Sequence, residues 1–326
     1  MRLLLQLLTV FVMAVSLQGW LPLGCLEEER IALLQLKDAL NYPNGTSLPS
    51  WRKGDAHCCS WERVECSNIT GQVTMIDLGS VRNQEQGDWF LNASLFLPFQ
   101  QLNTLSLSDN RIAGLVGKKG TYESRILSNL EHLNLGFNHF NNSILSFLKG
   151  FSSLKSLYLG DNKLEGLIDL KESLSSLEDL DLSGNNINKL IASRGPSNLS
   201  TLRLEDITIY ENSFQLLQSL GAFPKLTTLY LSYNDFRGRI SGFLYLKNLE
   251  YLDLSYNTFN NSIFQAIGMM TSLKTLMLQS CGLEGRIPTA QGFLNLKNLE
   301  FLDLSSNTLN NTIFQTIGNI DDSYSL

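Results

Sequence analysis

The chain has 326 residues and a formal net charge of −6. Hydrophobic residues make up 43% and charged residues 17%, which excludes a disordered chain and suits one or two ordinary domains or a single elongated one. The acidic balance argues against nucleic acid or an anionic membrane surface as the main partner, because both need a basic binding surface.

The chain begins with a short basic and apolar segment. In MRLLLQLLTVFVMAVSLQGW, Arg2 precedes an apolar run from Leu3 to Leu17. This order is typical of a secretory signal peptide, whereas a membrane-spanning helix needs about 20 apolar residues. We therefore predict a signal peptide over residues 1–24 and a secreted, extracellular chain, and no later stretch reaches the length of a membrane span.

Four of the five cysteines lie near the N-terminus: Cys25, Cys58, Cys59 and Cys66, with Cys281 far away. In a secreted chain such a cluster indicates disulfides, and four cysteines allow three pairings. A bond between the vicinal Cys58 and Cys59 would be strained. We favour Cys25–Cys58 with Cys59–Cys66, because the second closes a compact loop. A zinc site is the alternative, disfavoured by the export signal and by the lack of a C-x2-C pair.

The segment around these cysteines is predicted to form a helical cap. The glutamates at 27–29 suit a helix N-terminus, because carboxylates interact favourably with the helix dipole. Apolar residues within 31–40 give the helix a buried face, and Pro43 ends it. Trp51 and Trp61 are expected to cover the open end of the unit that follows.

The rest of the chain is repetitive. The pattern L-x-x-L-x-L-x-x-N occurs ten times, some copies imperfect, with spacings of 22 to 29 residues. Such spacings are typical of leucine-rich repeats. The repeats begin at Val73, Leu102, Leu130, Leu154, Leu177, Leu199, Leu226, Leu249, Leu273 and Leu299. The pattern predicts an α/β solenoid, a leucine-rich-repeat superhelix with a parallel β-sheet on its concave face and a disulfide-bonded helical cap at its N-terminus.

One repeat, LEYLDLSYNTF, shows the expected chemistry. Leu252 and Leu254 share one face of a strand and turn into the core. Asn257 is expected to end the strand, where its amide can bond backbone groups, and Phe259 and Ile263 should be buried in the outer wall. The asparagine role extends to Asn110, Asn138, Asn162, Asn185, Asn234 and Asn307.

Two repeats depart from this pattern. The sixth has Ile207 at the asparagine position and then the long stretch YENSFQLLQSLGAFPK, so we expect a local irregularity there. The ninth has Cys281 at that position, which predicts a buried free thiol. A reactive redox cysteine is the alternative, disfavoured because burial suppresses the thiolate.

Seven Asn-x-Ser/Thr sequons predict N-glycosylation. They are Asn44, Asn68, Asn92, Asn141, Asn198, Asn260 and Asn310. Asn141, Asn260 and Asn310 fall at the same place in their repeats, so glycans there would point in the same direction.

Two motifs carry a family resemblance. The cap segment CCSWERVEC and the extension LEGRIP, from Leu283 to Pro288, resemble those of plant extracellular leucine-rich-repeat proteins, and most of all of plant receptor-like proteins. The resemblance covers the whole chain after residue 24. It implies an apoplastic recognition module without enzymatic activity or cofactor, which in full-length relatives at the plasma membrane signals in defence or development through partner kinases. In this chain Asn142, Asn261 and Asn311 often replace the glycine of the extension.

The resemblance and the repeat pattern together predict four segments. These are a signal peptide (1–24), an N-terminal cap (25–72), about ten repeats (73–320) and a divergent tail without a C-terminal cap (321–326). The stretch from Leu246 to Gly268 recurs fifty residues later with 18 of 23 residues identical, but the pattern is then lost at Asp321. We therefore expect a shortened gene product that expresses poorly because its last repeat is uncovered.

The concave face is predicted to bind a peptide or protein ligand, with a receptor kinase as a further partner. Aromatic side chains there give rigid contact area, and the acidic ones could meet a basic peptide. The candidate residues are His132, Phe137, Tyr158, Asp179, Asp181, Arg203, Glu205, Tyr230, Tyr233, Tyr251, Asp253, Tyr256, Phe301 and Asp303.

Other functions were weighed against this one. Polygalacturonase-inhibiting proteins have a similar length and repeat number, but also a cysteine-rich C-terminal cap that this sequence lacks. A soluble decoy that competes with a receptor for its ligand is a third possibility. An enzyme is disfavoured, because His57, His132 and His139 form no metal-binding motif and the sequence has no glycine-rich phosphate loop.

Overall fold

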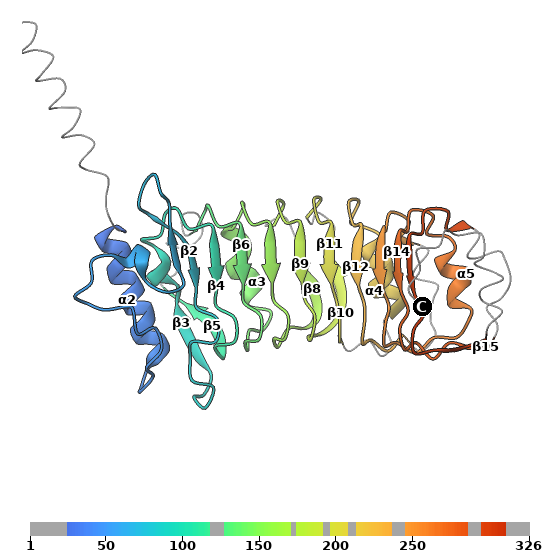
Figure 1. Ribbon diagram of the computed structural model, residues 1–326, viewed down its shortest axis with the longest axis horizontal. Coiled ribbons are helices and arrows are strands. Elements are labelled where there is room, and N and C mark those ends of the chain that lie inside the picture. Colours follow the sequence, from blue (N-terminus) through green and yellow to red (C-terminus); the bar gives the residue numbers. More distant parts are fainter. Residues whose placement is uncertain are drawn as a thin grey trace, which may run out of the picture.

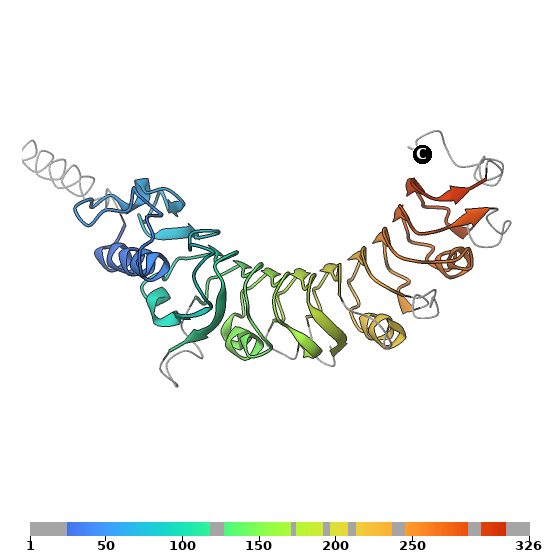
Figure 2. The same cartoon turned by 90° about the horizontal axis from the view of Figure 1, so that it is seen from below.

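The computed structural model describes residues 25–117, 127–170, 174–191, 196–207, 213–236, 245–285 and 295–310. The chain forms a curved solenoid with a helical cap at its N-terminal end and a sheet along the inner side of the arc (Figure 1, Figure 2). The predicted signal peptide and the predicted tail lie outside the described residues.

The inner sheet has eleven strands in the described part of the chain. Its first strand, β1 (Val64–Cys66), runs antiparallel to β2 (Val73–Asp77), and every later pair is parallel. After β2 come β4 (Thr104–Ser106), β6 (His132–Asn134), β7 (Ser156–Tyr158), β9 (Asp179–Asp181), β11 (Thr201–Arg203), β12 (Thr228–Tyr230), β13 (Tyr251–Asp253), β14 (Thr275–Met277) and β16 (Phe301–Asp303). Each of these ten parallel strands begins at the start of a predicted repeat or two residues after it, which confirms the predicted fold.

Leucines from neighbouring coils share one interior. In β13 the central Leu252 is fully buried, as is Leu254 beyond the strand. In the neighbouring register Leu252 lies opposite Leu229 of β12 and Leu276 of β14, and both are also fully buried. Each such side chain contributes about 1.5–3 kcal/mol by burial, so stability depends on stacking many coils.

The asparagines form a buried ladder, as predicted. The Nδ2 group of Asn257 donates to the carbonyls of Leu254 in its own coil (2.7 Å) and Leu231 in the preceding coil (2.9 Å). These bonds satisfy carbonyls that the turn would otherwise leave without donors. The same two contacts are made by Asn110, Asn138, Asn162, Asn185, Asn234 and Asn307.

The two unusual repeats keep the strand but change the ladder. Ile207 is buried, and its backbone N–H donates to Oδ1 of Asn234 in the next coil (2.9 Å). The helix α4 (Ser213–Leu220) follows where the sequence predicts an irregularity. Cys281 is a buried free thiol, as predicted, and its Sγ donates to the carbonyl of Leu254 (3.2 Å) in place of an asparagine amide.

Short helices and strand pairs form the outer side of the arc (Figure 2). Phe259 and Ile263 are buried there, as predicted. The helical segments are η2 (Ala93–Phe96), α3 (Ile144–Phe147), η3 (Leu148–Gly150) and α5 (Ile263–Ile267). The strand pairs are β3 (Trp89–Asn92) with β5 (Ile112–Val116), β8 (Glu165–Asp169) with β10 (Asn186–Ile191), and β15 (Glu284–Gly285) with β17 (Thr308–Leu309).

The cap closes the N-terminal end of the core. Its helix α2 (Glu27–Asn41) buries Leu33, Leu36 and Leu40, and the rings of Trp51 and Trp61 stack at 5.6 Å and are buried. Both tryptophans thus belong to the buried core cluster, and their role in covering the open end of the first coil stays a prediction.

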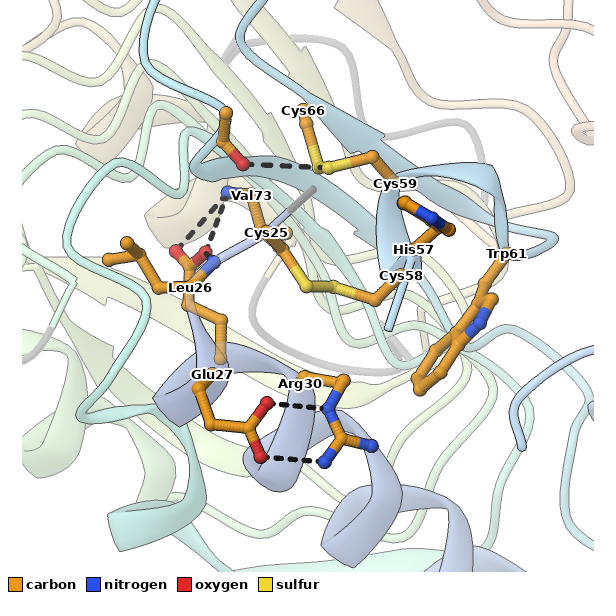
Figure 3. Close-up of a disulfide and its surroundings, with 12 residues drawn as sticks. Cys25, Leu26, Glu27, Arg30, His57, Cys58, Cys59, Trp61, Cys66 and Val73 are labelled. Atoms are coloured by element: carbon orange, nitrogen blue, oxygen red, sulfur yellow. Dashed lines mark hydrogen bonds and ion pairs between the residues drawn. A yellow bond between two sulfur atoms is a disulfide. The ribbon is translucent and has the colours of Figure 1, made fainter. Parts of the chain in front are cut away.

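Two disulfides fix the cap (Figure 3). One joins Cys25 to Cys58, beside the short helix η1 (Cys58–Ser60), and the other joins Cys59 to Cys66. This is the pairing preferred from the sequence. The second disulfide spans only seven residues, so it constrains one loop, whereas the first ties the start of α2 to that loop.

Candidate ligand-binding surface

The concave face is built from the residues that flank each buried strand leucine. In Asp179–Asp181, for example, Leu180 is buried while the aspartates on either side point outward. The predicted residues in this setting are His132, Tyr158, Asp179, Asp181, Arg203, Tyr230, Tyr251, Asp253, Phe301 and Asp303. The alternating pattern therefore identified which side chains face the concavity.

The other predicted residues lie just beyond the strands. Glu205 follows β11, and Phe137, Tyr233 and Tyr256 occupy the turn immediately before the ladder position. These three aromatic residues have φ between 54° and 58°, in the left-handed region that bulky residues rarely adopt. The turn places their rings at the rim of the concave face, where they are 63%, 57% and 41% exposed, respectively.

Five of the predicted side chains make a continuous strip across the middle of the sheet. The Tyr158 hydroxyl donates to Oδ2 of Asp179 (2.9 Å), and the Arg203 guanidinium donates to Oδ1 of the same carboxylate. On its other side Arg203 lies over the Tyr230 ring at 5.0 Å, and Tyr230 packs against Tyr251 with ring centroids 4.9 Å apart. The strip, which we call the Tyr–Arg strip, therefore crosses the neighbouring strands β7, β9, β11, β12 and β13.

The protonation states within the strip follow from its contacts. Burial raises the pKa of Tyr158, and the hydrogen bond to Asp179 raises it further. Burial and then the negative charge of Asp253 raise the pKa of Tyr251 to about 12. Burial lowers the pKa of Arg203, but the charge and hydrogen bond of Asp179 outweigh this and leave it raised. At neutral pH Tyr158 and Tyr251 are therefore protonated, and Arg203 is a cation paired with Asp179.

A second tyrosine pair lies beside the strip. Tyr233 and Tyr256 stack with ring centroids 4.4 Å apart and planes within 6° of each other. They come from equivalent turns of neighbouring coils, after β12 and β13. The stack follows from the pairing of β12 with β13, because the two rings occupy equivalent positions in adjacent coils.

The remaining predicted residues are not gathered with these. His132 and Phe137 belong to the third repeat, before the strip begins, and Phe301 and Asp303 belong to β16, two strands beyond Tyr251. Asp181 lies near the strip but turns one carboxylate oxygen toward the backbone N–H of Ser183 (2.9 Å). The structure therefore narrows the candidate surface to the fourth to eighth repeats.

The sequence reasoning missed part of the acidic character of this face. Asp161 lies next to Asp181 and Asp206, and burial together with these two charges raises the pKa of Asp161. In each repeat we count the residues from the start of the parallel strand to the position of the ladder asparagine. Over all ten repeats these stretches contain nine carboxylates and one arginine, Arg203. The carboxylates are Asp77, Asp109, Asp161, Asp179, Asp181, Glu205, Asp206, Asp253 and Asp303. Aspartate directly before the ladder position was the available signal for Asp109, Asp161 and Asp206.

The described residues contain neither a metal-binding cluster nor a membrane-spanning helix. No group of three or more His, Cys, Asp or Glu side chains in the described ranges is arranged to hold a metal ion. Within the same ranges, no helix has the length and apolar character needed to cross a membrane.

Family models match both parts of this architecture. A leucine-rich-repeat N-terminal domain matches residues 26–67. Leucine-rich-repeat models match residues 127–149, 173–193, 224–266 and 298–320. The chain therefore contains a leucine-rich-repeat N-terminal domain followed by leucine-rich repeats.

Curated relatives place the chain within a narrower group. It is 43% identical over 182 residues to receptor-like protein 9a of Arabidopsis thaliana, covering 55% of this chain and 19% of the relative. It is 34% identical over 286 residues to Cuscuta receptor 1 of Solanum lycopersicum, covering 86% of this chain and 22% of the relative. The homologues of this chain thus include plant receptor-like proteins, and the chain spans about a fifth of the length of these two.

A solved structure shares the fold. The Arabidopsis receptor kinase HAESA, in complex with the peptide hormone IDA and the co-receptor SERK1, matches with a TM-score of 0.52 and 26% identity. The match covers 87% of this chain and 50% of that chain. The solenoid described above is therefore the fold of a plant receptor ectodomain.

Proposed function

We propose that this chain is an extracellular ligand-recognition module of a plant receptor-like protein, and that it binds a peptide or protein ligand on its concave face. The observation that carries the proposal is the Tyr–Arg strip. Five side chains that are far apart in the sequence meet there on five neighbouring strands, and each contacts the next.

The strip has the properties of an efficient contact surface. Tyrosine offers large contact area with few rotatable bonds, so little conformational entropy is lost when it is immobilised by a ligand. The hydrogen bonds of Tyr158 and Arg203 to Asp179 hold these side chains in place before any ligand arrives. Pre-organisation of this kind lowers the free-energy cost of immobilising these side chains when a ligand binds.

The relatives support a role in signalling. HAESA is a receptor kinase whose structure contains a peptide hormone and a co-receptor. For this chain we propose a peptide or protein ligand in the corresponding class, with signalling through a partner kinase in full-length relatives.

An extracellular location accords with the cap. Its two disulfides need an oxidising compartment to form and persist. We propose the signal peptide at 1–24, the cap at 25–72, the repeats at 73–320 and the tail at 321–326 as the organisation of the chain, with the apoplast as its destination.

A random peptide library tests the proposed function without a known ligand. The folded chain, immobilised through its C-terminus, would be selected against phage-displayed 12-residue peptides, and enriched sequences would be synthesised and their dissociation constants measured. We expect selected peptides to lose about tenfold or more in affinity when Tyr158, Tyr230 and Tyr251 are replaced by alanine.

The matched control is Phe90→Ala, because Phe90 is a 61% exposed aromatic residue on β3, on the outer side of the arc. Its replacement should leave affinity unchanged. Selected peptides that bind the triple tyrosine variant and the unaltered chain equally would contradict the proposal, provided that both chains show the same cooperative melting.

A further inference from the structure

The second half of the Tyr–Arg strip and the stacked pair beside it form one group of aromatic rings. We call Tyr230, Tyr233, Tyr251 and Tyr256 the tyrosine cluster. All four come from β12, β13 and the turns that follow them, so they occupy two adjacent columns of the concave face. The rings pair across the columns, Tyr230 with Tyr251 and Tyr233 with Tyr256.

Two carboxylates border this cluster. Glu205 lies on the β11 side, where its Oε1 accepts a hydrogen bond from the Ser232 hydroxyl (2.5 Å). Asp253 lies at the end of β13, where its Oδ1 accepts from the backbone N–H of Ser255 (2.9 Å). Each therefore has its second oxygen without a hydrogen-bond partner among the described residues.

Both carboxylates act on both ring pairs. Desolvation raises the pKa of Tyr233 and of Tyr251, and the negative charges of Asp253 and Glu205 raise the pKa of each further. The contacts place the carboxylates beside the rings, because Glu205 bonds to Ser232, which directly precedes Tyr233, and Asp253 lies two residues from Tyr251 on β13. The region is negative and aromatic, and the Tyr233 and Tyr256 rings are open to solvent.

The same face already holds a cation in this way. Arg203 places its guanidinium over the Tyr230 ring at 5.0 Å while Asp179 pairs with its charge. A guanidinium or ammonium between an aromatic face and a carboxylate gains both cation–π attraction and ion pairing. The Tyr233 and Tyr256 half of the cluster, with Glu205 and Asp253, repeats these components, whereas the guanidinium of Arg203 lies over Tyr230 and leaves these two rings without a cation among the described contacts.

We propose that the tyrosine cluster is the subsite for an arginine or lysine side chain of an extended basic peptide, which rests on the proposed function. The excess of carboxylates over the whole concave face favours such a ligand, because nine carboxylates face one arginine whose charge is paired with Asp179. A basic peptide lying across the strands would be held by these charges along its length, with one cationic side chain fixed between the rings and the two carboxylates.

Three synthetic peptides test the subsite. They share a nine-residue Gly/Ser sequence and differ at alternate positions, which carry arginine, its uncharged isostere citrulline, or glutamate. We expect the arginine peptide to bind about tenfold or more tightly than the citrulline peptide, and the glutamate peptide not to bind. The preference should weaken between about 50 and 300 mM salt, because part of it is electrostatic.

Substitutions test whether the preference for arginine arises at the tyrosine cluster. Glu205→Gln with Asp253→Asn should remove most of the preference for arginine over citrulline while leaving the tyrosines in place. Asp303→Asn, on the same face but two strands beyond the cluster, should retain it. Equal binding of arginine and citrulline peptides to the unaltered chain would overturn the inference, as would an undiminished preference in the double variant.

The outcomes separate this inference from the proposed function. If library-selected peptides bind in a tyrosine-dependent way but contain no basic residue, the concave face binds peptides and the cationic subsite is wrong. If selected peptides bind equally well without the tyrosines, both the proposed function and the cationic subsite are wrong.

Discussion

The carboxylate of Glu29, in the cap helix, accepts the backbone N–H of Val73, at the start of the first repeat strand, with both oxygens at 3.2 Å. Glu29 is fully buried and also accepts the N–H of Leu26 (3.2 Å). One side chain therefore satisfies a donor in the cap and a donor at the edge of the solenoid. The contact links the cap to the first coil. No coil precedes the first one, so the cap helix supplies the acceptor for the Val73 N–H.

Replacing Glu29 by alanine should destabilise the cap. The buried N–H of Val73 would lose its acceptor, which costs about 1–3 kcal/mol, and the N–H of the exposed residue Leu26 would lose its acceptor at a smaller cost. We expect a lower urea midpoint for unfolding of the purified chain. Glu28→Ala is the matched control, since Glu28 is the exposed neighbour on the same helix. Equal midpoints for the two variants would show that the Glu29 contacts add nothing.

The pH dependence of this contact has a defined sign. Desolvation raises the pKa of Glu29, and this outweighs the bonds from Val73 and Leu26, which lower it. When the pKa of a carboxyl is higher in the folded state than in the unfolded state, its stabilising contribution is complete below the unfolded-state pKa. That contribution is lost as the pH rises through the folded-state pKa. The unfolding free energy of the unaltered chain, minus that of Glu29→Gln, should therefore increase from neutral pH toward about pH 4.5.

Cys281 should be unreactive in the native chain. Burial raises the pKa of its thiol to about 11, so little thiolate exists near neutral pH. With Ellman's reagent at about pH 8 we expect no colour from the folded chain and one thiol after unfolding in guanidinium, the disulfides being left intact. Rapid labelling before unfolding would instead indicate an accessible, redox-active thiol.

The leucine period made most of the fold predictable, because a residue such as Leu252 must alternate with outward-facing neighbours wherever a strand stacks on another. The ladder followed for the same reason, since Asn257 recurs at a fixed distance from that leucine. Contacts between coils were less accessible. Tyr158 and Asp179 were each predicted to face the concavity, but their pairing depends on register and rotamers that no local pattern contains.

The contacts of Asp88 show what the sequence could not reveal. Asp88 lies in the long connection between β2 and β3, and its carboxylate contacts Arg111 (3.1 Å), His139 (2.6 Å) and Lys163 (3.2 Å). The three partners follow the ladder asparagines of three successive coils, up to 75 residues away. Nothing in the sequence around Asp88 marks this reach, because it depends on the path of an irregular connection.

Replacing Asp88 by asparagine should weaken the association of this connection with the coils. Desolvation raises the pKa of Asp88, but the bonds and charges of Lys163 and His139 outweigh it and leave it lowered. A carboxyl with a lowered folded pKa stabilises the fold above its unfolded pKa, and that contribution disappears as the pH falls through the folded one.

The stabilisation by Asp88 should be small, at most about 1 kcal/mol near neutral pH, because the carboxylate is 37% exposed and solvent screens it. Urea unfolding of Asp88→Asn at low salt and in about 1 M NaCl checks this, with Glu85→Gln as the exposed acidic control in the same connection. A difference from the unaltered chain that persists undiminished at high salt would contradict an electrostatic role.

Asn198 differs from the other sequons. Its Nδ2 donates to the carbonyl of Ser175 in the preceding coil (3.3 Å), and its Oδ1 accepts from Lys225 of the next coil (2.7 Å). The same amide-to-carbonyl contact recurs at three asparagines outside sequons, Asn129, Asn248 and Asn298. Asn198 is therefore one rung of a second ladder along the edge where each coil enters the sheet.

This ladder predicts unequal glycosylation, because the glycan is attached at Nδ2. Asn141 and Asn260 are exposed, and each uses its Oδ1 to accept the N–H two residues along, at Ser143 (3.0 Å) and Ser262 (2.9 Å). In a chain secreted from plant cells, glycopeptide mass spectrometry should find these two sites occupied and Asn198 largely unmodified.

Stability supplies an independent check on the role of Asn198. Asn198→Ala should lower the unfolding free energy by about 0.5–1.5 kcal/mol, through loss of the bond to Ser175, even in chain treated to remove glycans. Asn141→Ala should have little effect under the same conditions, because no neighbouring coil depends on its amide in the described contacts. High glycan occupancy at Asn198, together with an unchanged unfolding free energy for Asn198→Ala, would contradict the second ladder. The Asn198 amide would then not contribute to the contact between neighbouring coils.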